Sequence, residues 1–453
     1  MAVLPILNES EDPDKTFLSD GLTRSLFDRL SYLPRLNVKM PTQVRSWQLN
    51  EIVQQGRDLK VDSVLVGDVL KQDDKLRLRL RMIDTSNAAI SWEKTFPLES
   101  ANTFAVQDEI TSDVTSALGV WLFGNEKKLL TRHQTDNQEA LSAYMRGQYY
   151  WSLKRSRETT PIAIKFFDQA IELDPSFAEA YAGRADCYVM MSNVLYGPLT
   201  TAEAMEKATF NARKALEINP LLAEAHASIG VINLRYNWDW NEAEKEFRQA
   251  IEINPDYAPA HFYYSILLAV LGRFDESVTE SEKGRRLDPD SPTAAANYGR
   301  ALYLARRFDE AQDFFRRMLL DKPGYPQYVH PMSWVLLQQG QTEEAIKMLE
   351  KLYAQDPLLA AAALGYAYGR AGRREDAERV LRFLEESGNT TPLHERVLVY
   401  IGLRDWDHAF ALLQKSCDQR FASMITLTTD PIYDVLKSDP RFAELAKRAN
   451  LMH

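Results

Sequence analysis

The chain has 453 residues, of which 45% are hydrophobic and 26% are charged, and its formal net charge is −10 at pH 7. This length and composition are typical of a globular protein with more than one domain. The acidic balance argues against nucleic acid as the main partner, because phosphate binding needs a basic surface. The two cysteines, Cys187 and Cys417, have no metal-binding spacing, so we expect both to be reduced packing residues.

The first part of the chain alternates strand and helix patterns. Residues 1–7 form a short apolar run that predicts a buried strand, and its position at the very start suggests that the chain belongs to a longer protein. Leucines repeat every four residues from Leu18 to Leu30, which predicts an amphipathic helix. A second strand over residues 36–40 and a second helix over about residues 44–59 follow.

Three more strands are predicted over residues 61–70, 76–82 and 90–96, and a helix over about residues 105–123 completes this region. The middle strand alternates strictly, with leucines on one face and the arginine stripe on the other, namely Arg77, Arg79 and Arg81. The order β-α-β-α-β-β-β-α predicts a small α+β domain over residues 1–125.

The arginine stripe allows two interpretations. It is either a solvated strand face whose charges discourage edge pairing, or a docking surface for an acidic partner or for acidic patches of this same chain. The sequence leaves both open.

Residues 126–138 are a charged linker, and beyond it prolines repeat at nearly constant spacing. Similar phrases end at Pro220, Pro255, Pro289, Pro323 and Pro357, and the last four follow their predecessors by 35, 34, 34 and 34 residues. A period of 34 is the signature of tetratricopeptide (TPR) helix pairs, which bury their apolar faces only by stacking. Earlier in the chain, Leu-Asp-Pro ends at Pro175, 45 residues before Pro220.

The repeat predicts about eight helical pairs over residues 139–425, which would form an all-α, right-handed superhelix. First helices should start near residues 139, 178, 223, 258, 292, 326, 358 and 390. A capping segment should follow over residues 426–453. The second pair has an insertion at residues 192–202, which is either a longer loop or a partner-binding loop. Trp238 and Trp240 are expected to pack under the third turn.

Small residues recur at one offset of the first helices, and alanine and phenylalanine recur in the second helices, as in Ala311 and Phe315. Because glycine costs a helix about 1 kcal/mol relative to alanine, this recurrence predicts close helix contacts there. The first-helix positions are Gly147, Ala185, Gly230, Ser265, Gly299, Ser333 and Gly365.

In TPR stacks, fixed positions of each first helix line a concave groove. Their side chains here are aromatic or apolar with two arginines, which suits a groove for an extended or helical peptide, although burial by neighbouring helices is an equally weighted alternative for each. The lysine and asparagine set that clamps a C-terminal carboxylate is absent. The predicted groove residues are Tyr144, Trp151, Met190, Arg235, Phe262, Ile266, Arg300, Tyr303, His330 and Trp334.

Several short motifs recur in a known family of domains. They are Val3-Leu-Pro, Leu18-Ser-Asp-Gly-Leu-Thr, Val64-Leu-Val-Gly and Phe104-Ala-Val-Gln-Asp-Glu-Ile, and Ser438-Asp-Pro-Arg-Phe lies near the end of the chain. With these motifs the chain resembles the TolB N-terminal-like domain of bacterial signalling proteins and the region that follows it. In that family the domain lies between a signalling head and a TPR tail, and the head is a serine/threonine kinase, a cyclase or a CadC-type regulator. The resemblance is strongest to the region downstream of the kinase, but the chain has no kinase motif.

The sequence thus predicts a non-enzymatic scaffold or sensor region of a bacterial signalling protein that binds a protein or peptide, without cofactor or metal. The alternative is a small-ligand, nucleotide or enzymatic site in the N-terminal domain, and self-association through the groove is a third hypothesis. No membrane span or signal peptide is visible. We therefore expect a cytoplasmic location, or a periplasmic one if a longer parent has an upstream span.

Overall fold

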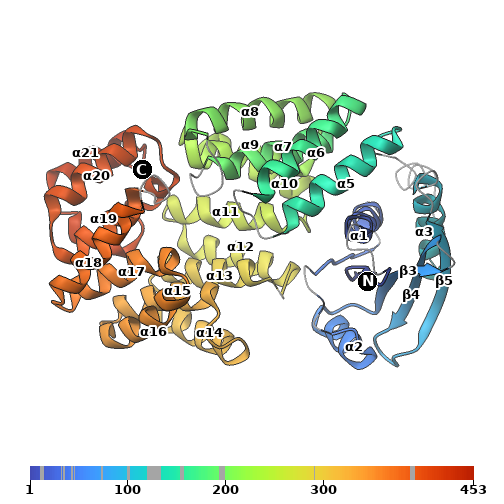
Figure 1. Ribbon diagram of the computed structural model, residues 1–453, viewed down its shortest axis with the longest axis horizontal. Helices are drawn as coiled ribbons and strands as arrows, with labels where there is room; N and C mark the ends of the chain where they lie inside the picture. Colours follow the sequence, from blue (N-terminus) through green and yellow to red (C-terminus); the bar gives the residue numbers. More distant parts are fainter. Residues whose placement is uncertain are drawn as a thin grey trace. The chain divides into compact units, whose positions relative to one another are not determined.

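The computed structural model describes residues 1–10, 15–31, 33, 36–41, 44, 46–72, 75–98, 103–119, 134–153, 158–192, 199–289, 291–387 and 393–452 (Figure 1). By its internal contacts the chain divides into two units. The first comprises Met1–Cys187, Phe210–Ala225 and Arg286–Ser291, and the second comprises Tyr188–Thr209, His226–Arg285 and Pro292–His453. Each unit is described by itself.

The first unit contains one five-stranded sheet. Its strands are β1 (Ala2–Val3), β2 (Leu7–Asn8), β3 (Ser63–Gln72), β4 (Lys75–Asp84) and β5 (Ile90–Leu98). Both β1 and β2 pair with β3 in parallel, whereas β3, β4 and β5 form an antiparallel meander. The predicted first strand is split at Pro5, which has no N–H to donate to the ladder.

The predicted strand over residues 36–40 is wrong. Only Lys39 bridges to Ala2, and its backbone exchanges hydrogen bonds with Met1 and Val3 at 3.0 and 2.8 Å. Because β1 is only two residues long, it offers no edge on which a longer strand could pair.

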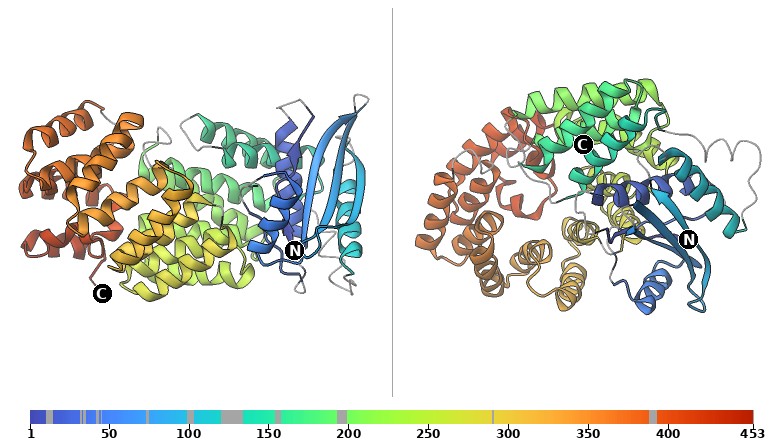
Figure 2. Two further views of the ribbon diagram at one scale, coloured as in Figure 1. Left: turned by 90° about the horizontal axis from the view of Figure 1, so that it is seen from below. Right: turned by 45° about the vertical axis from the view of Figure 1, so that its right-hand side comes forward.

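Helices cover both faces of the sheet. Helices α1 (Thr16–Ser31) and α3 (Thr103–Ala117) pack on one face, and α2 (Leu49–Asp58) packs on the other (Figure 2). The second helix was predicted over about residues 44–59, and α2 begins later, at Leu49. Leucines 22, 26 and 30 of α1 meet the inward face of β4, so the alternation read from the sequence is confirmed. That core is completed by Leu78, Leu80, Phe96, Val106 and Ile110.

Helix α1 also packs on the first repeat helix, α5 (Gln138–Ser152). Phe17 joins the repeat core that contains Phe167, and the guanidinium of Arg146 lies 4.7 Å from the centre of the Phe17 ring. A Cβ on Gly21 would overlap the side chain of Met145, so this approach requires glycine. The sheet region and the first repeat are therefore joined by a shared core. The predicted linker lies mostly outside the described residues.

Helix pairs follow at the predicted interval. The first helices are α5, α7 (Ala178–Met191), α9 (Ala223–Ile232), α11 (Ala258–Val270), α13 (Pro292–Leu304), α15 (Pro326–Gln338), α17 (Pro357–Arg370) and α19 (Leu393–Leu403). The second helices are α6 (Thr159–Leu173), α8 (Thr201–Ile218), α10 (Trp240–Ile253), α12 (Phe274–Leu287), α14 (Phe308–Asp321), α16 (Thr342–Gln355), α18 (Arg374–Glu386) and α20 (Trp406–Asp418). A π-helical turn, η2 (Asn233–Asn237), continues α9. Most of the 192–202 insertion lies outside the described residues.

The chain ends in two 3₁₀ turns and a helix. These are η4 (Ala422–Thr426), η5 (Pro431–Leu436) and α21 (Pro440–Arg448). Leu436 and Phe442 are buried, as the sequence predicted for a cap. Both cysteines are reduced and buried, as expected.

Three of the recurring glycines lie against phenylalanine rings, namely Gly147, Gly230 and Gly299, whereas Gly365 lies against Val399. Phe315 of α14 is fully buried, and a Cβ on Gly299 of α13 would fall well inside van der Waals contact with its ring. Gly230 faces Phe247 in the same way. Close helix contact therefore explains why glycine recurs where helix propensity disfavours it.

Replacing Gly299 with alanine should lower the free energy of unfolding by roughly 1–3 kcal/mol, because overpacking outweighs the better helix propensity of alanine. Urea titration measures the change. Gly284→Ala is the matched control, since the nearest atom to a Cβ there is 3.5 Å away, and it should be neutral or stabilising. An equally neutral Gly299→Ala would refute the packing argument.

Candidate protein-binding surface

The predicted groove residues differ in exposure. In the first unit, Tyr144 is buried in the repeat core against Phe167 and Phe177, and Trp151 is partly exposed. For Tyr144 the structure therefore matches the burial alternative. In the second unit Tyr303 is buried and Arg300 is exposed. The others are partly exposed, namely Met190, Arg235, Phe262, Ile266, His330 and Trp334.

Tyr303 is buried because the chain's own C-terminal region lies against it. Its hydroxyl donates a hydrogen bond of 2.9 Å to the carboxylate of Asp430, 127 residues further along. The same carboxylate accepts from the backbone N–H of Ile432 at 3.1 Å and so caps η5. Asp430 thus fixes both the turn and its place on α13.

Two more polar contacts hold this stretch between α13 and α19. The Arg306 guanidinium donates to both carboxylate oxygens of Asp434, at 2.6 and 3.0 Å. The Tyr433 hydroxyl lies 3.1 Å from Nδ1 of His394 on α19. We call residues 420–436 the return segment, because they carry the chain from the end of α20 back to the earlier first helices.

Apolar burial accompanies these contacts. The return segment has six strongly buried apolar side chains, and η4 packs against α11 and η2. The sequence predicted a cap on the last repeat only, so the reach to α13 was missed. The buried side chains are Met424, Ile425, Leu427, Ile432, Tyr433 and Leu436.

The chain end also meets the third helix pair. Arg420 donates to the carbonyl oxygens of Tyr236 and Asn237 at 2.9 and 3.2 Å, and its guanidinium lies 4.9 Å from the Trp238 ring centre. Asn450 donates to the Trp238 carbonyl at 2.9 Å and accepts from the Trp240 indole at 2.5 Å. Both indoles are buried as predicted, but they pack on the chain end.

Trp238 has an unusual backbone at this junction. It follows the π-helical turn η2 and has a φ of 56°, which is a left-handed conformation that a bulky residue rarely adopts. Such strain persists only where surrounding contacts hold it. The hydrogen bonds that the Trp238 region accepts from Arg420 and Asn450 provide that support.

Burial shifts the ionisable groups around the return segment. It lowers the pKa of His330 and of His394 to about 4, and the Arg300 charge adds to both effects. Burial also raises the pKa of Glu395 to about 7 and raises that of Asp430. These shifts have one cause: removal from water disfavours the charged form of a histidine and of a carboxyl group.

Part of the predicted groove remains accessible beside the return segment, namely Arg300, His330 and Trp334. We call these three residues together with Arg370, which the sequence did not predict, the open patch. Trp334 packs on Tyr366 with ring centres 5.4 Å apart, and its indole N–H points to Nε2 of His330 at 3.4 Å. The guanidinium of Arg370 donates to the Tyr366 hydroxyl at 3.1 Å. Two exposed arginines therefore flank aromatic rings, a composition typical of binding hot spots.

The arginine stripe is largely satisfied within the chain. Arg79 donates to both oxygens of Asp68 at 3.1 Å, and Arg81 donates to the same carboxylate at 3.1 Å. Asp68 belongs to β3 and its side chain is only 4% exposed. For these two arginines the acidic partner is the neighbouring strand. Arg77, opposite Pro97 of β5, is partly exposed.

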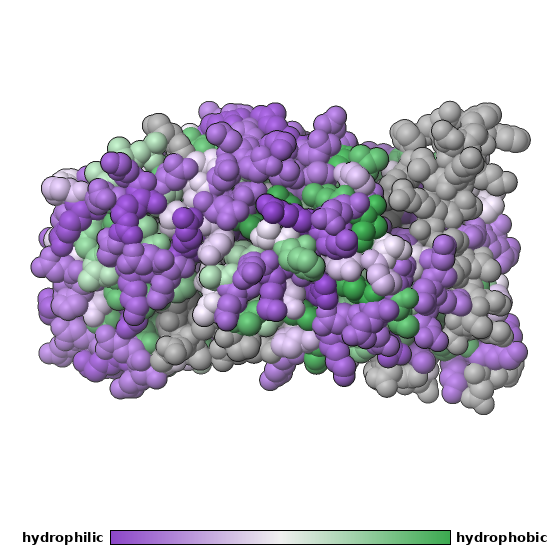
Figure 3. Space-filling view, turned by 90° about the horizontal axis from the view of Figure 1, so that it is seen from above, coloured by the Kyte–Doolittle hydropathy of each residue, from purple (hydrophilic) through white to green (hydrophobic). Residues whose placement is uncertain are grey.

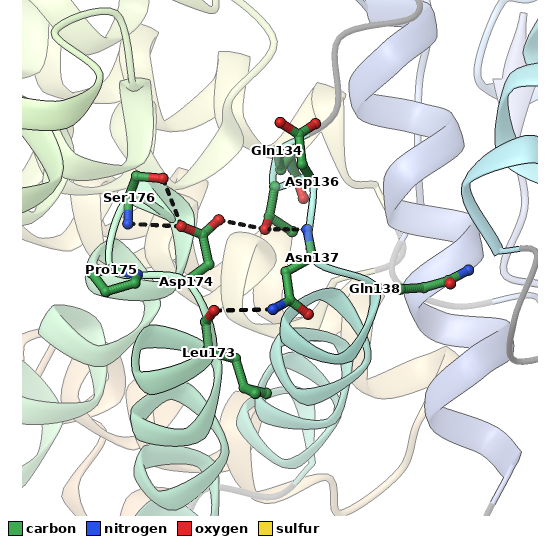
Figure 4. Close-up of a pocket in the computed structure, with 9 residues that line it drawn as sticks. Gln134, Asp136, Asn137, Gln138, Leu173, Asp174, Pro175 and Ser176 are labelled. Atoms are coloured by element: carbon green, nitrogen blue, oxygen red, sulfur yellow. Dashed lines mark hydrogen bonds between the residues drawn. The ribbon is translucent and has the colours of Figure 1, made fainter.

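A polar depression lies where α5 begins and α6 ends (Figure 4). Its side chains bond to one another. Asn137 caps α5 and also donates to the Leu173 carbonyl at 3.0 Å, while Asp174 accepts from Thr135 and Ser176. These bonds join the start of one helix to the end of the next, so the residues around the depression form a structural junction between α5 and α6.

The histidines at equivalent repeat positions have carboxylate partners. Nδ1 of His226 lies 2.6 Å from Glu246, and Nδ1 of His261 lies 2.7 Å from Glu280. These pairs indicate a structural role for both imidazoles. Within the described part of the chain, no group of three or more metal-type ligands is found.

Exposed apolar side chains are scattered. Figure 3 shows a face on which hydrophilic residues predominate and hydrophobic ones form small patches. Leu320, the most exposed large apolar residue among those described, is 79% exposed. Across the described ranges, no helix has the length and hydropathy that a membrane crossing requires.

Family models match three parts of the chain. The model of the HilA/YgeH-like transcriptional regulator second domain matches residues 1–113. Tetratricopeptide repeat models match residues 140–177, 231–284 and 282–328. TPR repeats are therefore present, as the proline spacing predicted. For the N-terminal region these comparisons find a HilA/YgeH-like domain, and they do not show the predicted likeness to TolB-like or kinase-linked proteins.

Two kinds of curated protein are similar over part of their length. A putative adenylate cyclase 3 of Rhizobium meliloti is 29% identical over 185 residues, which is 40% of this chain and 31% of that protein. The transcriptional regulator HilA of Salmonella typhimurium is 25% identical over 160 residues, which is 34% of this chain and 28% of that protein. The matches thus span under a third of each relative.

Solved TPR structures are similar as well. A thermophilic TPR protein of Thermus thermophilus has 17% identity, covers 44% of this chain and 99% of its own, and has a TM-score of 0.37. Yeast Tom70 has 15% identity, covers 77% of this chain and 83% of its own, and has a TM-score of 0.44.

Proposed function

We propose that this chain is the protein-binding region of a bacterial regulatory protein, and that the open patch binds a segment of a partner polypeptide. The TPR matches support protein interaction as its role. The likeness to HilA and to a putative cyclase supports a regulatory setting. Neither DNA binding nor cyclase activity is carried over from those relatives.

The observation that carries the proposal is the open patch itself. Arg300 and Arg370 are exposed beside the partly exposed ring of Trp334, and all three project from first helices. Aromatic and arginine side chains supply most of the energy in peptide-binding interfaces. Their positive charge favours acidic segments and speeds encounter with them.

A random-peptide display library selected on the full chain tests this proposal. Selected peptides, measured by fluorescence polarisation, should lose at least about tenfold in affinity on Trp334→Ala and on Arg300→Glu, as truncation of a hot spot predicts. Arg316→Glu is the matched control, because Arg316 is an exposed arginine on the second helix α14. Peptides that bind all four proteins equally, or a library that yields none, would reject the proposal.

The alternative of a small-ligand site in the N-terminal domain has no comparable support. Its described polar residues mostly bind one another, as Asp68 does with Arg79 and Arg81. A cytoplasmic location remains a proposal, and the peptide-binding test does not depend on it.

A further inference from the structure

The return segment contacts α13 and α19 as a bound peptide would. Each of its two acidic side chains meets a donor on α13 or just beyond its end, Asp430 at Tyr303 and Asp434 at Arg306. Between them, Tyr433 is buried and reaches His394 on α19. The sequence Asp430-Pro-Ile-Tyr-Asp434 thus presents two carboxylates four residues apart with an aromatic ring between them.

The placement of Asp430 links it to the open patch. The charge of Arg300 acts on Asp430, on Tyr303 and on both histidines, so these groups lie within one electrostatic neighbourhood. Arg300 itself is exposed. The positive corner of the groove is therefore already facing an acidic side chain that the chain itself supplies.

The geometry points to the return segment as a built-in occupant of the groove: the face formed by α13 and α19 binds acidic segments of the type Asp-Pro-x-Tyr-Asp, and an external partner of that chemistry must displace residues 420–436. This inference rests on the proposed function, because it names the partner class and the regulation of the same groove.

The fold allows the segment to leave as a loop. Its ends are held by the last helix pair, since Arg441 at the start of α21 donates to Asp407 of α20 at 2.8 Å and stacks 4.2 Å from the Phe410 ring centre. The polar hold at Asp434 is a solvent-exposed ion pair, with side chains 43% and 38% exposed, and such pairs contribute little. Release breaks the contacts of the segment with α13 and α19 and also those with α11 and η2, and it leaves the packing of α21 on α20 in place.

Because the return segment is part of the same chain, it should occupy the groove in preference to an external peptide. A segment on a short tether has an effective concentration of about 1 mM. If its intrinsic dissociation constant were about 10 μM, the closed form would outnumber the open one by about 100 to 1, and an external peptide would bind about 100-fold more weakly than to an open groove. Weakening the tethered segment should therefore reveal the site.

The test uses the full chain and a fluorescein-labelled peptide of residues 426–437. The double variant Asp430→Ala/Asp434→Ala leaves the groove helices intact and should bind this peptide at least tenfold more tightly than the unchanged chain. Adding Arg306→Glu should reduce the gain, because a glutamate there repels Asp434 of the peptide, and the peptide with both aspartates changed to asparagine should bind more weakly than the unchanged peptide. Glu444→Ala, an exposed carboxylate on α21, is the matched control and should bind like the unchanged chain.

Equal peptide binding by the double variant and the unchanged chain, with both folded by circular dichroism, would overturn the inference. Hydrogen exchange on the unchanged chain provides a second test of whether the return segment opens, and this test needs no variant. Amides of residues 424–436 should exchange at least about 100-fold faster than those of Ala360–Tyr366 in α17, as a local opening predicts; equally slow exchange would show a permanent part of the core.

The two proposals fail in different ways. If library peptides bind the double variant and the unchanged chain alike and still depend on Trp334, the scaffold function stands and the return segment is not its regulator. If no peptide depends on Trp334 or Arg300 in either protein, the scaffold function falls.

Discussion

Replacing Phe315 with alanine should lower the free energy of unfolding by about 3–5 kcal/mol. The ring is fully buried, packs directly on Gly299 and lies edge-on to Phe314 with ring centres 5.6 Å apart. Because Gly299 has no side chain that can move into the vacated volume, the cavity stays open, and the penalty should fall at the high end of such substitutions.

Urea unfolding followed by circular dichroism measures this loss, and hydrogen exchange of α13 and α14 locates it, since a chain of this size need not unfold in one step. Leu320→Ala on the same helix is the control. That side chain is 79% exposed, so the change should stay within about 0.5 kcal/mol. A loss below about 1 kcal/mol for Phe315→Ala would mean that the ring does not fill the space between the helices.

The repeat region was predictable because its determinants are local. Prolines 255, 289 and 323 each follow the end of a second helix by two residues, as the sequence indicated. Gly299 and Phe315 are only 16 residues apart, so one period of the sequence contains both members of the contact. A repeating local pattern of this kind is readable without knowing how distant parts of the chain meet.

The strand predicted over residues 36–40 was wrong for a physical reason. Residues 36–40 have the composition of a strand, but a strand also needs an edge on which to pair. The two-residue length of β1 limits that edge, and only Lys39 forms a bridge. Composition cannot report the length of a distant partner.

The return segment was missed because its contacts join residues far apart in sequence. Tyr303 and Asp430 are 127 residues apart, and Trp240 and Asn450 are 210 apart. One signal was present: Met424-Ile-Thr-Leu427 is a mostly apolar run at the boundary between the predicted repeats and the predicted cap. More apolar residues than one open face can cover indicate a second contact surface.

The groove is also where the largest pH effect is expected. As the pH falls from 6.5 to 4, the free energy of unfolding should decrease by several kcal/mol. His330 and His394 have a folded pKa of about 4, below the 6.5 of the free side chain, so the unfolded chain binds more protons in this window. Each histidine contributes at most about 3 kcal/mol, at 1.36 kcal/mol per pH unit, and less because both are partly exposed.

Glu395 works in the opposite direction. Its folded pKa of about 7 lies above the ordinary 4.5, so burial destabilises its ionised form, and stability is lost as the pH rises from 4.5 to 7. Burial also raises the pKa of Asp430, so both carboxyls oppose the two histidines and reduce the net loss of stability on the acid side. Glu395→Gln should stabilise the chain at pH 8 by about 1–3 kcal/mol and change it little at pH 4.

The double variant His330→Gln/His394→Gln should flatten the acid limb of the stability curve measured by urea unfolding at half-unit pH steps. His408→Gln, a histidine of α20 whose side chain is 66% exposed, controls for loss of a surface imidazole. If the double variant keeps the full acid loss, other carboxylates cause it and the histidines are not held neutral by burial. A second result would link this pH effect to the return segment: at pH 5, the amides of residues 424–436 exchange more slowly in the double variant than in the unchanged chain. In that case protonation of the two histidines releases the return segment, because each protonated imidazole adds a positive charge beside Arg300.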